Sequence, residues 1–319
     1  MNRHRTAISV LLATGALLAG ALTAASPSAA VQRPASPGSW SAERMRAATP
    51  LDITAAPGAS ARTAPTTAEH PTTIAPTPAS SSPTASLKAS PAAFPQPGGA
   101  WTSGGAVVKT SGRVFFTFNG KSASCSGDSI TSANGSTVIT AGHCVKYQGA
   151  WHTDWIFVPG YDNGNAPYGQ WRATKTFATD QWVASEDMNM DVGLAVVAPL
   201  NGRTLSQTVG AQGIAFNGGY NKKMYAFGFP AAAPYDGTKL VYCSGNSGKD
   251  FLLTKDHSLP CNMTGGSSGG PWFQDFNEAT GLGTQVSVNS FGYTFLPNRM
   301  YGPYFGNEAK AAYDKAQTA

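Results

Sequence analysis

Gly-Gly-Ser-Ser-Gly-Gly-Pro at residues 265–271 and Thr-Ala-Gly-His-Cys at residues 140–144 are the two most specific motifs of the chain. The first stretch places hydroxyl groups among glycines, whose backbone can approach another chain closely. The second places an imidazole just after the β-branched run 137–140. A serine attacks a carbonyl well when a base removes its proton and backbone N–H groups hold the oxyanion. The two stretches therefore predict a serine nucleophile and a histidine base, His143.

The order of these residues along the chain excludes one well-known alternative. Residues 266–270 also match the Gly-x-Ser-x-Gly turn of the α/β-hydrolases, in which the histidine follows the serine. The last histidine of this chain is His257, so every available base lies upstream of the serine. The order histidine, acid, serine is the one found in chymotrypsin-like peptidases.

The third member of such a site is a carboxylate that receives the second ring N–H of the histidine. Asp191 opens the apolar run Asp-Val-Gly-Leu-Ala-Val-Val, where an unpartnered charge would be costly. Asp187 is the competitor, in the more polar segment Ser-Glu-Asp-Met-Asn. We therefore favour Asp191. Chemistry alone does not separate Ser267 from Ser268 as the nucleophile.

Short β-branched or alternating runs separated by turn residues indicate an all-β sandwich or barrel. These runs cover residues 113–118, 137–140, 155–159, 192–197, 224–229, 240–243 and 284–290. Asn-Gly and Asp-Gly pairs between them favour hairpins. One helix is expected near the C-terminus, capped by Asn307, where alanine-rich sequence favours helix.

Four motifs resemble the chymotrypsin-like serine endopeptidases: Thr-Ala-Gly-His-Cys, the Asp191 strand, Gly-x-Ser-Gly-Gly-Pro and Ser-Phe-Gly at 290–292. The resemblance runs from about residue 107 to residue 315, and its secreted bacterial branch, which includes the glutamyl endopeptidases, is the most similar. It implies two six-stranded antiparallel β-barrels with the active site in the cleft between them. It also implies that Ser268 is the nucleophile and that the backbone N–H groups of Gly266 and Ser268 form the oxyanion hole.

The same resemblance implies a specificity pocket that contains no charged residue. It places Asn262, Met263 and Thr264 before the nucleophile, and Ser290, Phe291 and Gly292 along the wall, with Asn289 just before them. Residues 290–292 are also the candidate edge for a peptide. A preference for Lys or Arg would need a buried carboxylate, which this set lacks. Glutamyl endopeptidases usually carry a histidine where Asn289 stands, so a preference for glutamate stays open.

The first hundred residues are expected to lie outside the catalytic domain. Residues 1–30 have a basic start, an uncharged stretch and small residues, as in a secretory signal peptide, with cleavage after Ala30 or near residues 23–25. Residues 31–100 hold 12 of the 22 prolines and are predicted to be a disordered pro-segment or linker, since such a composition cannot bury a core. Removal on maturation is favoured, which would make the chain a zymogen. Residues 101–319 form the predicted peptidase domain.

The four cysteines of a secreted chain predict two disulfides. Their spacing favours Cys125 with Cys144 and Cys243 with Cys261 among three possible pairings. The resemblance also implies the first of these. Zinc is disfavoured because the cysteines stand singly, without Cys-x-x-Cys or His-x-x-x-His. The net charge of +5 comes mainly from the first hundred residues and forms no basic stripe, so nucleic acid is not expected as a partner.

Together these observations predict a secreted, extracellular, monomeric serine endopeptidase that needs no cofactor and no metal. Its triad would be His143, Asp191 and Ser268, and its partner a protein or peptide substrate. Two alternatives use the same fold: a catalytically silent binding protein, and an esterase with the same triad, since acyl chemistry does not distinguish an ester from an amide.

Overall fold

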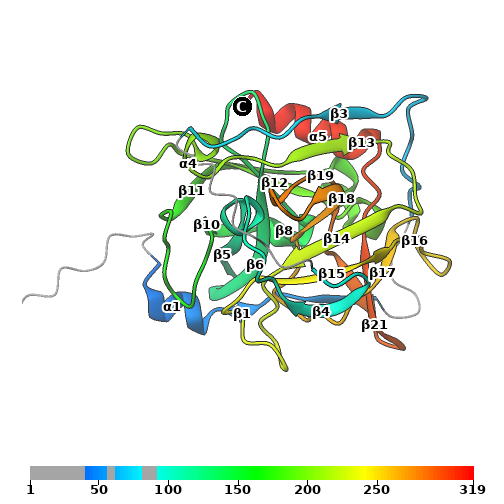
Figure 1. Cartoon of the computed structure of the whole chain (residues 1–319), viewed down its shortest axis with the longest axis horizontal. Helices are drawn as coiled ribbons and strands as arrows, with labels where there is room; N and C mark the ends of the chain where they lie inside the picture. Colours follow the sequence, from blue (N-terminus) through cyan, green and yellow to red (C-terminus); the bar gives the residue numbers. More distant parts are fainter. Residues whose placement is uncertain (1–39, 56–61, 81–91) are drawn as a thin grey trace, which may run out of the picture. The chain divides into compact units, whose positions relative to one another are not determined.

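The computed structural model describes residues 40–55, 62–80 and 92–319. The predicted signal peptide, residues 1–30, lies outside the described residues. Residues Trp40–Ala319 form one compact unit, and its elements are strands for the most part (Figure 1). Among the described residues, no helix is long and apolar enough to cross a membrane.

The first half of this unit is a closed barrel of six antiparallel strands. The strand order is β6-β5-β10-β11-β12-β7, and β7 pairs back onto β6 to close the ring. Asn119 and Gly120 join β5 to β6 with φ of 48° and 74°, the turn that their sequence predicts. The strands are β5 (Ser111–Phe118), β6 (Lys121–Ile130), β7 (Thr137–Thr140), β10 (Thr153–Pro159), β11 (Trp171–Ala178) and β12 (Gly193–Val197).

The second half divides its strands between two sheets. One contains β13 (Gly213–Phe216), β14 (Lys223–Gly228), β15 (Val241–Asn246), β18 (Pro271–Asn277) and β19 (Leu282–Val288). The other contains β16 (Gly248–Lys249), β17 (His257–Pro260), β20 (Phe291–Tyr293) and β21 (Leu296–Gly302). Every β-run predicted from the sequence overlaps a strand, and the all-β, double-barrel prediction is confirmed.

Short helices and a small hairpin complete the two halves. The C-terminal helix α5 (Asn307–Gln317), red in Figure 1, packs on β12 and β13. Its N-cap is Gly306 rather than the predicted Asn307, whose side chain instead accepts a hydrogen bond from Asn217. The other short elements after residue 100 are α2 (Val107–Thr110), α3 (Asp180–Ser185), α4 (Leu205–Val209), the 3-10 turns η1 (Gly142–Cys144) and η2 (Met188–Met190), and the hairpin β8 (Lys146–Tyr147) with β9 (Ala150–Trp151).

For residues 40–55, 62–80 and 92–100, the structure corrects the prediction that the segment 31–100 is disordered. These residues form α1 (Ala42–Ala47), β1 (Thr49–Pro50), β2 (Ile53–Ala55), β3 (Thr72–Ile74) and β4 (Gln96–Ala100). These strands extend sheets of the two halves by pairing with β6, β20, β13 and β15 respectively. Trp40 and Met45 are each only 1% exposed. A composition too poor to build its own core can still order itself against a core that the rest of the chain supplies.

Candidate active site

His143 and Asp191 meet because the strands that carry them are paired. β7 ends at Thr140, β12 begins at Gly193, and these two residues face each other in the antiparallel ladder. His143 lies in the turn η1 just after β7, and Asp191 lies just before β12. The His143 ring Nδ1 is 2.8 Å from Asp191 Oδ2, and both side chains are fully buried. This contact was predicted from sequence.

The Asp191 carboxylate accepts two further hydrogen bonds. The backbone N–H of His143 donates to Oδ1 at 2.7 Å, and the Ser290 hydroxyl donates to Oδ2 at 2.6 Å. The carboxylate therefore fixes both the backbone and the ring of His143. An ionised carboxylate can only accept, so this pairing favours the His143 tautomer with its proton on Nδ1 and with Nε2 as an acceptor. His143 Nε2 is buried and has no hydrogen-bond partner among the described residues.

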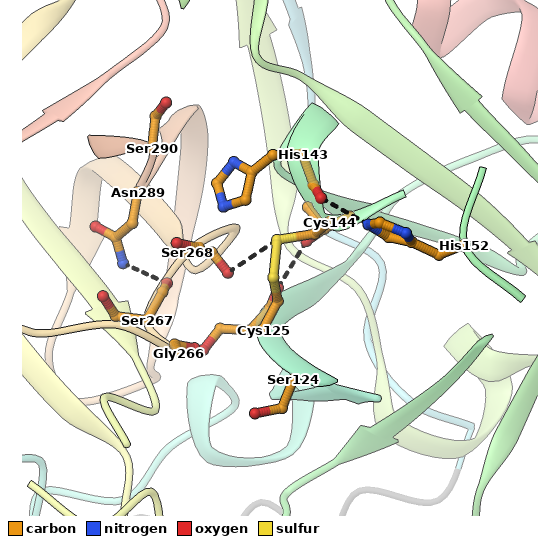
Figure 2. Close-up of a disulfide and its surroundings, with 12 residues drawn as sticks. Ser124, Cys125, His143, Cys144, His152, Gly266, Ser267, Ser268, Asn289 and Ser290 are labelled. Atoms are coloured by element: carbon orange, nitrogen blue, oxygen red, sulfur yellow. Dashed lines mark hydrogen bonds between the residues drawn. A yellow bond between two sulfur atoms is a disulfide. The ribbon is translucent and has the colours of Figure 1, made fainter. Parts of the chain in front are cut away.

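A disulfide joins the histidine turn to the neighbouring strand. Cys144 is bonded to Cys125 of β6, and the second disulfide joins Cys243 to Cys261, so the pairings favoured by the sequence are both present. Figure 2 shows the first disulfide beside His143 and Ser268. The disulfide therefore holds the histidine turn to β6. Cys144 Sγ also lies 3.8 Å from the Ser268 carbonyl oxygen, so the bridge is in contact with the loop that carries the serines.

Residues 265–271 form a tight turn that only glycine permits at two positions. Gly266 and Gly269 have φ of +92° and +81°. A Cβ on Gly269 would lie 2.0 Å from the Thr140 hydroxyl, so a larger residue would push the turn away from β7. The glycines thus bring the nucleophile loop into contact with the strand that leads to His143.

Ser126 of β6 connects the nucleophile loop to the first barrel. Its N–H donates to the Ser268 carbonyl at 2.7 Å, and its hydroxyl donates to the Gly266 carbonyl at 2.8 Å. The same hydroxyl accepts the Phe229 N–H at 2.9 Å, and the Ser126 carbonyl accepts the Thr140 hydroxyl at 2.7 Å. One buried residue therefore fixes the loop through backbone groups and leaves the Ser268 side chain out of this network.

The two predicted oxyanion donors differ in what they contact. The Ser268 N–H has no hydrogen-bond acceptor in the described part of the chain, whereas the Gly266 N–H donates to the Leu51 carbonyl at 3.4 Å. The alternative nucleophile, Ser267, uses its hydroxyl to donate to the Thr264 carbonyl at 2.8 Å. Because the Ser267 hydroxyl is engaged in this hydrogen bond, Ser268 is favoured over Ser267 as the reactive serine.

His152, which lies between β9 and β10, supports the site from beside the histidine turn. It is 7% exposed, its ring stacks on Phe116 at 4.2 Å, and its Nε2 donates to the His143 carbonyl at 2.8 Å. Burial lowers the pKa of His152 to about 4. The aromatic residues on either side, in Trp-His-Thr-Asp-Trp, are the one sequence signal that could have indicated a buried ring.

The depressed pKa of His152 predicts a loss of stability in acid. An unfolded histidine titrates near pH 6.5, so the unfolded chain binds more protons than the folded chain between pH 6.5 and 4. Stability from this group is complete above pH 6.5 and falls by about 3 kcal/mol as the pH drops to 4. His152→Gln keeps a donor for the His143 carbonyl and removes the titration. In a Ser268→Ala background, the variant should lose about 3 kcal/mol less than its parent over this range, measured by urea unfolding.

The control for this measurement is internal. Burial also lowers the pKa of His257 to about 4 and raises that of Asp128 to about 8, but both residues are present in both proteins, so their effects cancel in the comparison. Parallel curves of stability against pH for the two proteins would contradict the account of His152.

The residues assigned to the specificity pocket are bonded largely to the protein itself. The Asn289 amide accepts from Trp272 Nε1 at 2.7 Å and donates to the carbonyls of Phe227 and Ser267.

The residues before the nucleophile are bonded in the same way. Asn262 accepts from the Tyr235 hydroxyl and Thr264 donates to the Ala232 carbonyl, both at 2.6 Å. The buried Met263 packs in the core of the second half. Phe291 and Gly292 belong to β20, and the roles of all these residues toward substrate stay predictions.

One group of side chains in the described part of the chain has the spacing of metal ligands: Cys125, His143 and Cys144. Its two sulfur atoms are joined to each other in a disulfide, so neither offers a thiolate. The group therefore does not fit a metal ion, and its chemistry is that of a histidine held by a covalent bridge.

Comparison with known proteins identifies the family. The structure matches the protease Anisep from Arthrobacter nicotinovorans with a TM-score of 0.63 and 44% sequence identity, over 67% of this chain and 98% of Anisep. It matches the thermostable serine protease AL20 from an extremophilic microorganism with a TM-score of 0.63 and 41% identity, over 67% of this chain and 99% of AL20. This chain belongs to the family of chymotrypsin-like serine proteases, in its bacterial branch.

Two further similarities are more distant. A Glu endopeptidase shares the fold, with a TM-score of 0.55 and 16% identity over 70% of this chain and 97% of that one. An extracellular metalloprotease of Bacillus subtilis is 26% identical over 182 residues, and this chain spans about half of its length, 54%. No protein-family model matches the sequence. Taken together, the similarities support a protease.

Proposed function

We propose that this chain is an extracellular serine endopeptidase that uses Ser268, His143 and Asp191 to hydrolyse peptide bonds through an acyl-enzyme. The observation that carries the proposal is the buried His143–Asp191 pair, which leaves a free imidazole nitrogen at the loop of Ser268. The similarity to serine proteases at more than 40% identity supports the same chemistry. Two disulfides favour an oxidising compartment outside the cytoplasm.

In the proposed reaction, Ser268 Oγ forms a bond to the peptide carbonyl carbon while its proton passes to His143 Nε2. The oxyanion that forms is stabilised by the N–H groups of Gly266 and Ser268. The carbon–nitrogen bond then breaks as the imidazolium returns the proton to the leaving nitrogen. Water, activated by the same imidazole, attacks the ester and releases the acid and the serine. Asp191 stabilises the imidazolium in both halves of the cycle.

A serine-directed fluorophosphonate tests this proposal on a chain from which the predicted pro-segment has been removed. We expect the reagent to add to Ser268 and to no other serine, because labelling requires an activated hydroxyl next to oxyanion donors. Peptide mass spectrometry would locate the adduct, and a parallel digest of an unstructured protein would report cleavage. The matched control is Ser267→Ala, which should still label at position 268. An adduct on Ser267, or labelling of Ser268 that survives His143→Ala unchanged, would overturn the assignment.

A further inference from the structure

Residues Thr49–Ala55, here called the strap, join the two halves of the molecule. The strand β1 pairs in parallel with β6, with Thr49 opposite Ala123 and Pro50 opposite Ser124. Three residues later β2 pairs in parallel with β20, from Ile53 opposite Phe291 to Ala55 opposite Tyr293. β6 carries Ser126, and β20 directly follows Ser290. The strap therefore passes over the segments that hold the nucleophile loop and Asp191.

Leu51, at the centre of the strap, is hydrogen-bonded to both halves. Its N–H donates to the Ser124 carbonyl of the first barrel at 2.9 Å. Its carbonyl accepts the Gly266 N–H, one of the two oxyanion donors, at 3.4 Å. The strap is thus held at the point where the reacting carbonyl of a substrate would have to lie.

Asp52 brings the strap closer still to the reacting groups. A Cβ added to Gly265 would lie 3.0 Å from the Cβ of Asp52, so the strap packs directly on the nucleophile loop. Burial raises the pKa of Asp52, and the nearby His143 opposes this shift. Because Gly265 has no side chain, the strap can pack against the nucleophile loop at this position.

The contacts of Leu51 differ from those of a reacting substrate. Efficient stabilisation needs donors at about 2.7–3.1 Å from the oxyanion position. The Leu51 carbonyl has one donor at 3.4 Å, and the Ser268 N–H does not reach it. The carbonyl therefore blocks the approach to Ser268 without being polarised for attack. At the same time, β2 occupies the edge of β20, so no other strand can pair there.

The strap is anchored by burial and by the segment that precedes it. Ile53 is 6% exposed and belongs to the same core as Phe291 and Tyr301, whereas its neighbour Thr54 is exposed. Upstream, Arg44 of α1 makes an ion pair with Asp154 of β10 at 2.7 Å. These contacts give the strap a fixed position without requiring it to be bound as a substrate.

We propose that the strap acts as an inhibitor within the same chain, by covering the edge of β20 and the Gly266 N–H that the proposed function assigns to the substrate. This inference rests on the proposed function, because an inhibitor needs an active site to block. The strap must be displaced or cut before a substrate can reach Ser268. The residues removed on maturation would then include a segment that folds onto the enzyme and keeps it silent.

Two variants of the full chain separate the strap from its surroundings. Ile53→Asp places a charge in the buried position, and Thr54→Asp makes the same change at the exposed neighbour. The first measurement is amide hydrogen exchange in a Ser268→Ala background, which excludes self-cleavage. We expect Ile53→Asp to raise exchange at residues 291–293 and at Gly266 by at least about 10-fold, since the lost burial frees the strap. Thr54→Asp should leave exchange unchanged.

The second measurement is the rate at which a fluorophosphonate labels Ser268 in intact chains, with the mass of each chain checked so that the strap is known to be attached. Ile53→Asp should label at least about 10-fold faster than the original chain and than Thr54→Asp. Unchanged exchange in Ile53→Asp would overturn the docked strap. Raised exchange with equally fast labelling of all chains would overturn inhibition but not the proposed function. Raised exchange with no labelling of any chain would overturn both the inhibitor role and the proposed function.

Discussion

Replacement of Ser268 by alanine is expected to lower kcat for peptide hydrolysis by about 10⁶-fold, to the level of the reaction without the nucleophile. The substitution removes only the hydroxyl group, which takes no part in the hydrogen bonds that hold the nucleophile loop. Those bonds run from Ser126 to the backbone carbonyls of Ser268 and Gly266. The variant should therefore fold as the original chain does, with an unchanged midpoint of thermal unfolding.

The matched control for this variant is Ser267→Ala. The Ser267 hydroxyl bonds to the Thr264 carbonyl at 2.8 Å, so its removal should cost about 1 kcal/mol of stability and leave most of the activity. Both variants should be assayed with a peptide substrate after the predicted pro-segment has been removed. Retention of turnover by Ser268→Ala, or its loss in Ser267→Ala alone, would exchange the roles of the two serines.

Asp191→Asn is expected to lower kcat by about 10⁴-fold. The carboxylate accepts three hydrogen bonds, from the His143 N–H, the His143 ring and the Ser290 hydroxyl. An amide has only one accepting oxygen and would direct its own N–H groups at one of these donors. If the oxygen stays with the backbone N–H, the ring must carry its proton on Nε2, which leaves no base for Ser268.

Asp187→Asn is the control, because Asp187 was the competing candidate. Its carboxylate accepts backbone N–H groups of Arg62 and Thr63 at 3.1 and 2.6 Å, and that of Asn189 at 3.2 Å. None of these groups takes part in the proposed reaction, so we expect less than a 10-fold change in kcat once the leader has been processed. The pH profiles should differ as well, since only Asp191→Asn changes the tautomer of the base. Equal losses in both variants would contradict the choice of Asp191.

The sequence predicted the pairing of His143 with Asp191 because a charged side chain at the start of an apolar strand needs a partner. The pairing of β7 with β12, which brings the two strand ends together, was not predicted. The sequence also predicted both disulfides. It did not predict that Ser290, assigned to the pocket wall, donates to Asp191, because a hydroxyl in an apolar strand gives no sign of the direction in which it points. Nor did it predict that His152 is buried beside the site, because its stacking partner, Phe116, belongs to β5, a different segment of the chain.

The composition of residues 31–100 gave the wrong prediction for the parts that the structure describes. The rule that few apolar residues mean disorder assumes that a segment must bury its own surface. Here Trp40, Met45 and Ile53 are buried in cores built mainly by residues 101–319. The parallel pairing of β2 with β20 likewise has no local signal, since it joins residues more than two hundred positions apart.

Ser126 gives the molecule a property that neither half has alone. It lies on the first barrel, yet its N–H and hydroxyl fix the carbonyls of Ser268 and Gly266 and the N–H of Phe229 in the second. The conformation of the nucleophile loop therefore depends partly on the first barrel. A second half folded by itself would lack the hydrogen bonds that shape this loop. The active site should therefore form only at the last stage of folding, when the two halves dock.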